Sequence, residues 1–198
     1  MTLFSKDIVR KIEGYYPSGL DFGSVVVLGL ISQDSIPARV KHIENVALIS
    51  EAVAKRLEMD AKTAFFAGIM HGIGKCIFDG RIITAGEFDE AKKRLIEIYS
   101  SRIEAHLFAA YCIAFHLELY DKGHGLTADD FPSHWKPIIV EKLLEIAKVV
   151  AICDDVELFL SDGALDFGLK ERPEKMFPND IGIINLATEE AEKIIKNQ

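Results

Sequence analysis

Two histidines and one aspartate occupy positions that predict a metal site. His42 lies within a helical pattern of apolar residues, and His71 ends a segment that is apolar almost all round. Asp154 lies on a helical stripe that should face the core, together with Leu143, Ala147 and Val150. A carboxylate on such a stripe is costly unless a cation or hydrogen-bond donors compensate it. Two imidazoles and a carboxylate are usual ligands of a divalent transition metal, so this triplet predicts metal-dependent chemistry.

Each member of the triplet also has a simpler interpretation. His42 alone could be a packing or partly exposed histidine at the flank of its helix. A buried His71 needs partners for both ring nitrogens, which a metal and a hydrogen-bond acceptor would supply together. A hydrogen bond from a histidine would compensate the Asp154 carboxylate without any metal. The residues taken one by one leave both interpretations open.

The segments that carry the triplet have the apolar periodicity of helices. Asp60 has the position of an N-cap before the central helix, and the glycines after His71 are typical of a helix end. We expect helices over residues 5–13, 36–58, 61–70, 87–119 (with a break near 100–101) and 137–160, and a short helix from Thr188. The predicted fold is therefore all-α, a single domain over residues 1–198 with about seven to nine helices.

The composition predicts an acidic protein of the cytoplasm. The 198 residues are 49% hydrophobic, which is enough for a packed core, and the net charge of −8 makes the chain a poor general binder of nucleic acid. No apolar core of a signal peptide is present, and the apolar run Val25–Ile31 is too short to span a membrane. Cys76, Cys112 and Cys153 form no CxxC pattern, so we expect buried thiols in a reducing compartment.

Three separated segments resemble the HD-domain metal-dependent phosphohydrolase superfamily. They are Arg39–His42, Ala67–Lys75 and Ala147–Asp154. The family pattern has a histidine on an early helix, a His-Asp pair at the end of a central helix and an aspartate on a late helix. The resemblance covers about residues 36–160 and leaves 161–198 as a C-terminal extension, over the site or at a partner surface. It implies an HD-like helical bundle in which His42, His71 and Asp154 bind Mn, Fe, Ni, Co or Zn.

The chain departs from the family pattern at one position. The second residue of the His-Asp pair is Gly72, whereas the family has an aspartate there that binds the metal and often bridges two metals. Glycine offers no ligand, although it is a good helix terminator. A mononuclear site with two histidines, one aspartate and water remains chemically possible. Asp79, Glu87 and Asp155 are acids that could replace the missing ligand, and the spacing selects none of them.

Further basic side chains are candidates for binding phosphate. Superfamily members with two metals take extra histidines from the region that here contains His106, His116 and His124. These three residues are therefore candidates for a second metal or for substrate phosphate, with a surface or packing role as the alternative. The resemblance also implies that Lys75 contacts the substrate phosphate or the leaving group. Its alternative role is to compensate the negative end of the preceding helix.

The resemblance implies two possible functions. The first is hydrolysis of a nucleotide or another small phosphate ester by water that the metal activates. The second is a degenerate, non-catalytic HD-like domain with a regulatory or interaction role, in which the triplet forms a polar network without metal. The order and spacing of the three segments favour the first function, and Gly72 supports the second. Neither a phosphate-binding glycine loop nor a nucleophile elbow occurs in the sequence.

Overall fold

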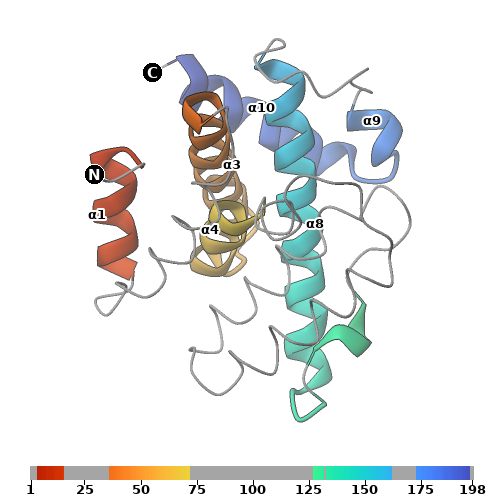
Figure 1. Ribbon diagram of the computed structural model, residues 1–198. Helices are drawn as coiled ribbons and strands as arrows, with labels where there is room; N and C mark the ends of the chain where they lie inside the picture. The colour runs from red at the N-terminus through yellow and green to blue at the C-terminus, as the bar shows by residue number, and fades with distance from the viewer. Residues whose placement is uncertain (1–3, 16–35, 72–126, 132, 162–172, 197–198) are drawn as a thin grey trace.

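All regular elements that the computed structural model describes are helices (Figure 1). The described residues are 4–15, 36–71, 127–131, 133–161 and 173–196. Their elements are α1 (Lys6–Tyr15), α3 (Ile36–Arg56), α4 (Ala61–Met70), the 3₁₀ helix η1 (Ala128–Asp130), α8 (Pro137–Leu160), α9 (Pro173–Met176) and α10 (Ile181–Lys196). The expected all-α class is confirmed, and the helix expected over 87–119 lies outside the described residues. Within the described part of the chain, no helix combines the length and apolarity needed to cross a membrane.

The turn between α3 and α4 combines a backbone conformation that glutamate rarely adopts with a favourable helix cap. Glu58 has a φ of 56°, in the left-handed region, and α3 ends shortly before it at Arg56. Asp60 caps α4 as the sequence predicted, because its Oδ1 accepts hydrogen bonds from the N–H groups of Lys62 and Thr63, both at 3.1 Å. The Asp60 cap therefore fixes where α4 begins and in which direction it leaves the turn.

The helices α3 and α4 approach each other closely at Gly68. A Cβ atom at this position would lie 2.5 Å from Cα of Ala47 and 2.9 Å from its backbone nitrogen. Because both neighbours are backbone atoms, no change of side-chain rotamer on α3 would make room for a larger residue. The absence of a side chain at Gly68 is thus what permits this packing distance.

The helix α8 lies beside α3 and carries the core-facing stripe predicted from the sequence (Figure 1). The apolar members of that stripe are buried as expected: Leu143, Ala147 and Val150. Asp154, at the end of the stripe, keeps 23% of its side chain exposed, so it is only partly buried. A core cluster joins α3, α8 and α10, and its members include Ile49, Val53, Val149, Ile152, Val156, Ile184, Ala187 and Ala191.

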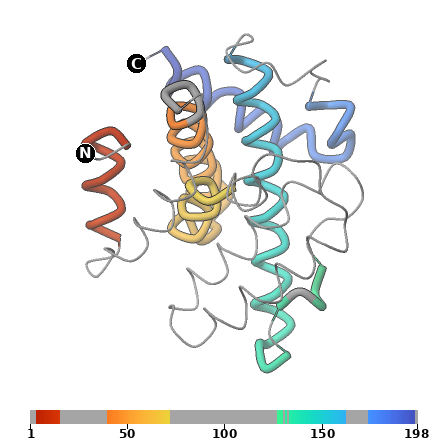
Figure 2. The backbone as a smooth tube through the Cα atoms, in the orientation of Figure 1, coloured from red at the N-terminus to blue at the C-terminus, as the bar shows by residue number. Residues whose placement is uncertain are grey.

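The C-terminal helix α10 packs against α3 and α8 as part of this core (Figure 2). It begins at Ile181, so the expectation of a short helix from Thr188 is wrong. Thr188 lies inside the helix, where its Oγ1 donates to the carbonyl of Ile184 at 2.9 Å. This bond satisfies the hydroxyl group, so Thr188 does not have to act as a helix cap. Arg56 at the end of α3 forms an ion pair with Glu189 at 2.6 Å, which adds a surface contact to the apolar packing.

The helix α1 is attached to α3 through the buried carboxylate of Glu51. The Tyr15 hydroxyl and the Lys11 ammonium group, both on α1, contact this carboxylate, and Lys55 contacts it at 2.6 Å. Burial and the neighbouring Glu51 charge raise the pKa of Tyr15 above its ordinary value, so the phenol remains a hydrogen-bond donor. Glu51 therefore holds α1 in place by compensated charge rather than by apolar packing alone.

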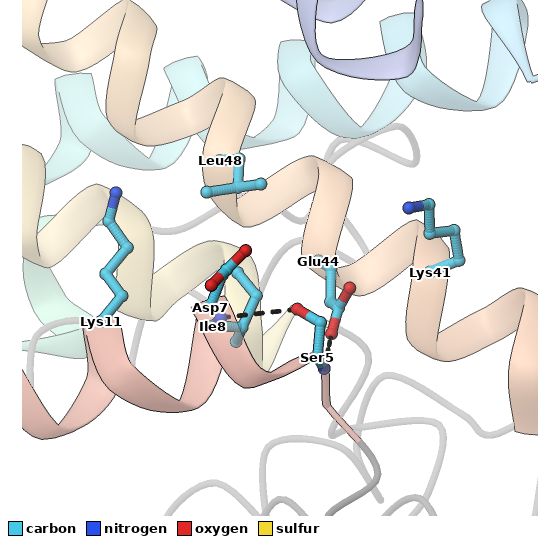
Figure 3. Close-up of a pocket in the computed structure, with 7 residues that line it drawn as sticks. All are labelled: Ser5, Asp7, Ile8, Lys11, Lys41, Glu44 and Leu48. Carbon is cyan, nitrogen blue, oxygen red and sulfur yellow. Dashed lines mark hydrogen bonds between the residues drawn. The ribbon is translucent and has the colours of Figure 1, made fainter. Parts of the chain in front are cut away.

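An open pocket of about 380 Å³ lies between α1 and α3 (Figure 3). Its lining residues are Ser5, Asp7, Ile8, Lys11, Lys41, Glu44 and Leu48. The N–H of Ser5 donates to the Glu44 carboxylate at 2.5 Å, which joins the start of α1 to α3. No member of the triplet lines this pocket, so it is separate from the candidate metal site.

Candidate metal centre

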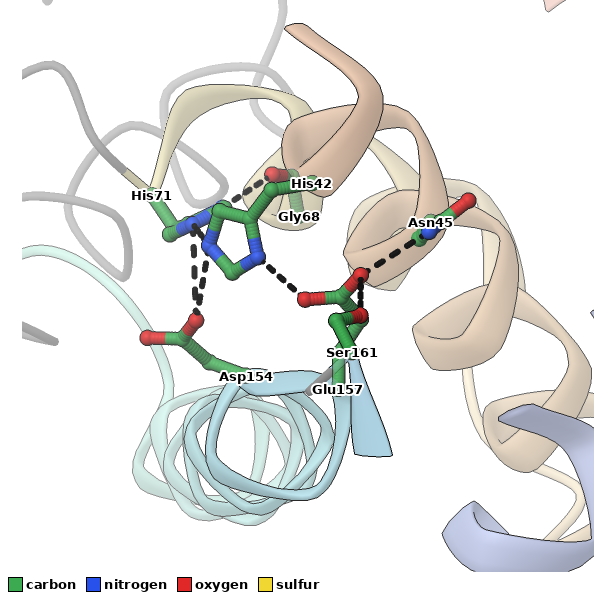
Figure 4. Close-up of polar contacts among 7 residues, drawn as sticks. All are labelled: His42, Asn45, Gly68, His71, Asp154, Glu157 and Ser161. Carbon is green, nitrogen blue, oxygen red and sulfur yellow. Dashed lines mark hydrogen bonds and ion pairs between the residues drawn. The ribbon is translucent and has the colours of Figure 1, made fainter. Parts of the chain in front are cut away.

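The three side chains of the triplet meet where α3, the end of α4 and α8 come together (Figure 4). Nε2 of His42 lies 3.1 Å from Oδ1 of Asp154, and Nε2 of His71 lies 3.6 Å from the same oxygen. The two Nε2 atoms are 3.0 Å apart. One possible ligand atom from each residue lies within 4.8 Å of the others, so three residues spread over positions 42 to 154 converge on one point.

His71 is oriented by the backbone of its own helix. Its Nδ1 lies 2.5 Å from the carbonyl oxygen of Gly68, and since a carbonyl only accepts, Nδ1 is the donor. In the neutral ring, Nε2 then directs a lone pair towards His42 and Asp154. The close approach of Gly68 to α3 therefore also sets where the ring of His71 can lie.

His42 is oriented by Glu157, a residue that the sequence reasoning missed. Oε2 of Glu157 lies 2.5 Å from Nδ1 of His42, and the Glu157 side chain is fully buried. Glu157 follows Asp154 by three residues on α8, so the two carboxylates lie on neighbouring positions of one helix face. The sequence did contain a signal for Glu157: it is an acid three residues after a predicted ligand, on the same core-facing stripe.

The two carboxylates change the acidity of His42. Burial lowers the pKa of this imidazole, but hydrogen bonds to Asp154 and Glu157 outweigh burial and raise the pKa to about 9. The pKa of Glu157 is held below its ordinary value: burial raises it, but the hydrogen bond and charge of His42, together with hydrogen bonds from Ser161 and Asn45, lower it by more. Without metal, an imidazolium at His42 therefore supplies the positive charge that the carboxylates require.

We expect the affinity for a divalent metal to rise with pH up to about 9. The metal must displace the His42 proton, so below its pKa of about 9 each pH unit is expected to raise the apparent affinity about tenfold. In metal-free protein the same shift contributes stability that is fully present below the ordinary value of 6.5 and is lost as the pH rises through about 9. Calorimetric titration with Ni²⁺ at several pH values between neutral and mildly alkaline checks this, and a constant affinity would contradict it.

The donor set of the triplet fits a divalent transition metal. Two imidazole nitrogens and one carboxylate oxygen suit Mn, Fe, Co, Ni or Zn, and three protein ligands leave positions for water and substrate. Both histidines have their Nδ1 atoms engaged by an acceptor, which is the usual arrangement for histidines that bind metal through Nε2. In the part of the chain that the structure describes, this is the one such group of potential ligands.

The remaining candidates from the sequence fall into two groups. Those that lie outside the described residues are Gly72, Lys75, Asp79, Glu87, His106, His116 and His124. Asp155 lies on α8 and is half-buried, but it does not belong to the group of possible ligand atoms around His42. His134 is exposed and likewise stands apart from that group.

Cys153 is a buried thiol next to a member of the triplet. Burial raises its pKa to about 12, a hydrogen bond with Ser50 opposes that rise, and the charge of Asp154 adds to it. The expectation of buried free thiols is confirmed for Cys153, while Cys76 and Cys112 lie outside the described residues.

We expect Cys153 to resist alkylation in the native protein at pH 8, because the reactive thiolate is scarce and enclosed. Iodoacetamide labelling followed by peptide mass spectrometry should find Cys153 unmodified before unfolding and modified after unfolding in guanidinium. Rapid native labelling at Cys153 would contradict the burial of this part of α8.

The chain was compared with protein families, curated proteins and solved structures. A model of the HD domain matches residues 39–158, which is more than half of the chain. The comparisons with curated proteins and with solved structures find no match. The matched segment begins in α3 and ends in α8, and it includes all three members of the triplet.

Proposed function

This chain belongs to the HD-domain family, and from that premise we propose that it is a metal-dependent phosphohydrolase whose ligands are His42, His71 and Asp154. The substrate class that we propose is a small phosphate ester, with nucleotides as the first group to test. A bound divalent metal would supply Lewis acidity and an activated water for attack on phosphorus.

The observation that carries this proposal is the orientation of the two histidines. Both rings face Asp154 through Nε2, while Nδ1 of His42 is engaged by Glu157 and Nδ1 of His71 by the Gly68 carbonyl. A packing histidine needs no such paired arrangement, whereas a metal ligand requires a lone pair on the ring nitrogen that faces the metal. The anionic side chains then balance part of the metal charge.

We propose that the part of the site that the structure describes binds one metal rather than two. Glycine at position 72 removes the carboxylate that bridges two metals in the family pattern, and neither Glu157 nor Asp155 belongs to the group of possible ligand atoms. Water and a phosphoryl oxygen would complete the coordination. Lys75 remains a proposal for contact with the substrate phosphate, and His106, His116 and His124 remain proposals for a second metal or for that phosphate.

Turnover by the full-length chain tests the proposed function. Protein loaded separately with Mn²⁺, Co²⁺, Ni²⁺ or Zn²⁺ is assayed with aryl phosphates and phosphodiesters, nucleoside monophosphates and triphosphates, and cyclic nucleotides. We expect phosphate or nucleoside release that a chelator abolishes and that added metal restores. Turnover that survives chelation would point to another chemistry.

A second candidate function is a non-catalytic regulatory or interaction domain. It is favoured by Gly72 and by the contacts of His42, whose two ring nitrogens meet Asp154 and Glu157 without requiring a metal. Under this interpretation the protein binds none of the four metals after incubation and rapid desalting. Stoichiometric metal in the purified protein would contradict it.

A further inference from the structure

Glu157 contacts His42 on the ring nitrogen that does not face the triplet. Its Oε2 lies 2.5 Å from Nδ1, whereas Nε2 of the same ring lies 3.1 Å from Asp154 (Figure 4). The carboxylate therefore sits behind His42 and is not placed to complete a coordination shell around the point where the Nε2 atoms meet. Any influence that it has on that point passes through the imidazole.

The Glu157 side chain is itself held by two further donors. Nδ2 of Asn45 donates to its Oε1 at 2.8 Å, and Oγ of Ser161 donates to the same oxygen at 2.6 Å. Asn45 lies one turn after His42 on α3, and Ser161 is the residue that caps the end of α8. A buried carboxylate is costly unless its oxygens have partners, and here one oxygen is occupied by the two donors while the other is directed at His42.

Two carboxylates compete for the proton of a neutral His42 ring, and Glu157 is the closer one: its Oε2 lies 2.5 Å from Nδ1, whereas Oδ1 of Asp154 lies 3.1 Å from Nε2. A carboxylate has no proton to give, so the hydrogen bond requires a proton on Nδ1 of the imidazole. The neutral ring then carries its lone pair on Nε2, the nitrogen that faces Asp154 and His71. A carboxylate behind a ligating histidine also increases the basicity of the ligand nitrogen.

We propose that Glu157 is a positioning residue of the metal centre, which holds His42 as the Nδ1–H tautomer with Nε2 directed at the metal, and that Asn45 and Ser161 hold Glu157 for this task. The effect on metal affinity rests on the proposed function, whereas the effect on the tautomer does not. The proposal adds a residue to the site that offers no ligand atom of its own.

The test compares Glu157→Ala, Glu157→Gln and Glu157→Asp in the full-length chain. Nitrogen-15 NMR of the histidine rings at pH 10, in metal-free protein, reports the tautomer of His42. We expect the Nδ1–H tautomer in the wild type and the Nε2–H tautomer in Glu157→Gln, because Asn45 and Ser161 occupy its one amide oxygen and leave its NH2 group facing Nδ1. Glu157→Ala should give a mixture of tautomers and weaken Ni²⁺ binding by about 10- to 100-fold, with at least as large a loss for Glu157→Gln.

Glu157→Asp keeps the negative charge, but its side chain is one methylene shorter and no longer reaches Nδ1 of His42. It therefore distinguishes the effect of the charge from that of the hydrogen bond, also if the alanine variant fails to fold. We expect this variant to bind Ni²⁺ more weakly than the wild type does. The matched control is Glu51→Gln, which alters another buried acid whose partners are Lys11, Tyr15 and Lys55. It should reduce thermal stability and leave the His42 tautomer and the Ni²⁺ affinity unchanged.

Two results would overturn the proposal. One is a wild-type tautomer and affinity in both Glu157→Ala and Glu157→Asp. The other is the Nδ1–H tautomer with wild-type Ni²⁺ affinity in Glu157→Gln, because Nδ1 would then need no acceptor. If the wild type binds no Ni²⁺ at all, the proposed function fails, and the tautomer comparison still decides the role of Glu157.

Discussion

A His71→Ala variant is expected to lose the bound metal and, with it, phosphate ester hydrolysis. Removal of a residue behind a ligating histidine typically weakens metal affinity about 10- to 100-fold, so removal of one of three protein ligands should weaken it by more than about 100-fold. Metal ions contribute several kcal/mol to such transition states, and each ~1.4 kcal/mol is a factor of ten in rate. We therefore expect kcat/KM to fall by at least about 1,000-fold.

The measurement combines elemental analysis with turnover. Near one equivalent of transition metal in the wild type and far less in His71→Ala would support the proposed ligand set. His71 is buried, so truncation also leaves a cavity. Asp154→Asn is the second variant, because its side chain is partly exposed and the change preserves shape while removing the anionic oxygen. It should fold normally and show the same direction of loss.

His134→Ala is the matched control for the histidine change. His134 is exposed and lies outside the group of possible ligands, so this variant should keep the metal content and turnover of the wild type. Equal metal content in His71→Ala, Asp154→Asn and the wild type would mean that the metal binds elsewhere. No metal in the wild type would favour the regulatory interpretation.

The convergence of the triplet could be predicted because each of its residues belongs to a helical pattern that is visible in the sequence. His71 ends an apolar helix, and Asp154 continues the stripe of Leu143 and Val150, so each should point inward. Helical periodicity predicts the face of the helix on which a residue lies. The family resemblance predicts which of these faces, far apart in the sequence, pack against one another. The structure places Nε2 of His42 3.1 Å from Oδ1 of Asp154 and 3.0 Å from Nε2 of His71.

Other features depend on contacts between helices, which periodicity does not contain. Glu157 looks like one acid among many in a chain with 31 Asp and Glu residues until α3 is placed against α8. The start of α10 at Ile181 depends on burial of Ile184 and Ala187 in the core, which overrides the capping preference of Thr188. Gly68 resembles a weak point of a helix in the sequence, yet in the structure it is where α4 meets α3.

A Gly68→Ala variant is expected to destabilise the fold by about 1–3 kcal/mol, although alanine is the better helix former. The added Cβ would lie 2.5 Å from Cα and 2.9 Å from N of Ala47, so α3 and α4 must move apart. Because the Gly68 carbonyl orients His71, the same movement should displace that ring and weaken metal binding. Urea unfolding and Ni²⁺ titration of the full-length protein measure the two effects.

Two further substitutions test whether the loss of stability in Gly68→Ala comes from the close approach of α3 and α4. Gly182→Ala on α10 is the matched control, because nothing lies within 4 Å of a Cβ there, and it should leave stability unchanged or raise it by up to about 1 kcal/mol. Ala47→Gly should not rescue Gly68→Ala, since the conflicting atoms belong to the backbone of Ala47 and not to its methyl group. Rescue by Ala47→Gly, or wild-type stability and metal affinity in Gly68→Ala, would show that the spacing of α3 and α4 does not depend on the missing side chain. Loss of stability in Gly68→Ala alone, accompanied by weaker metal binding, would instead tie the position of His71 to the distance between these two helices.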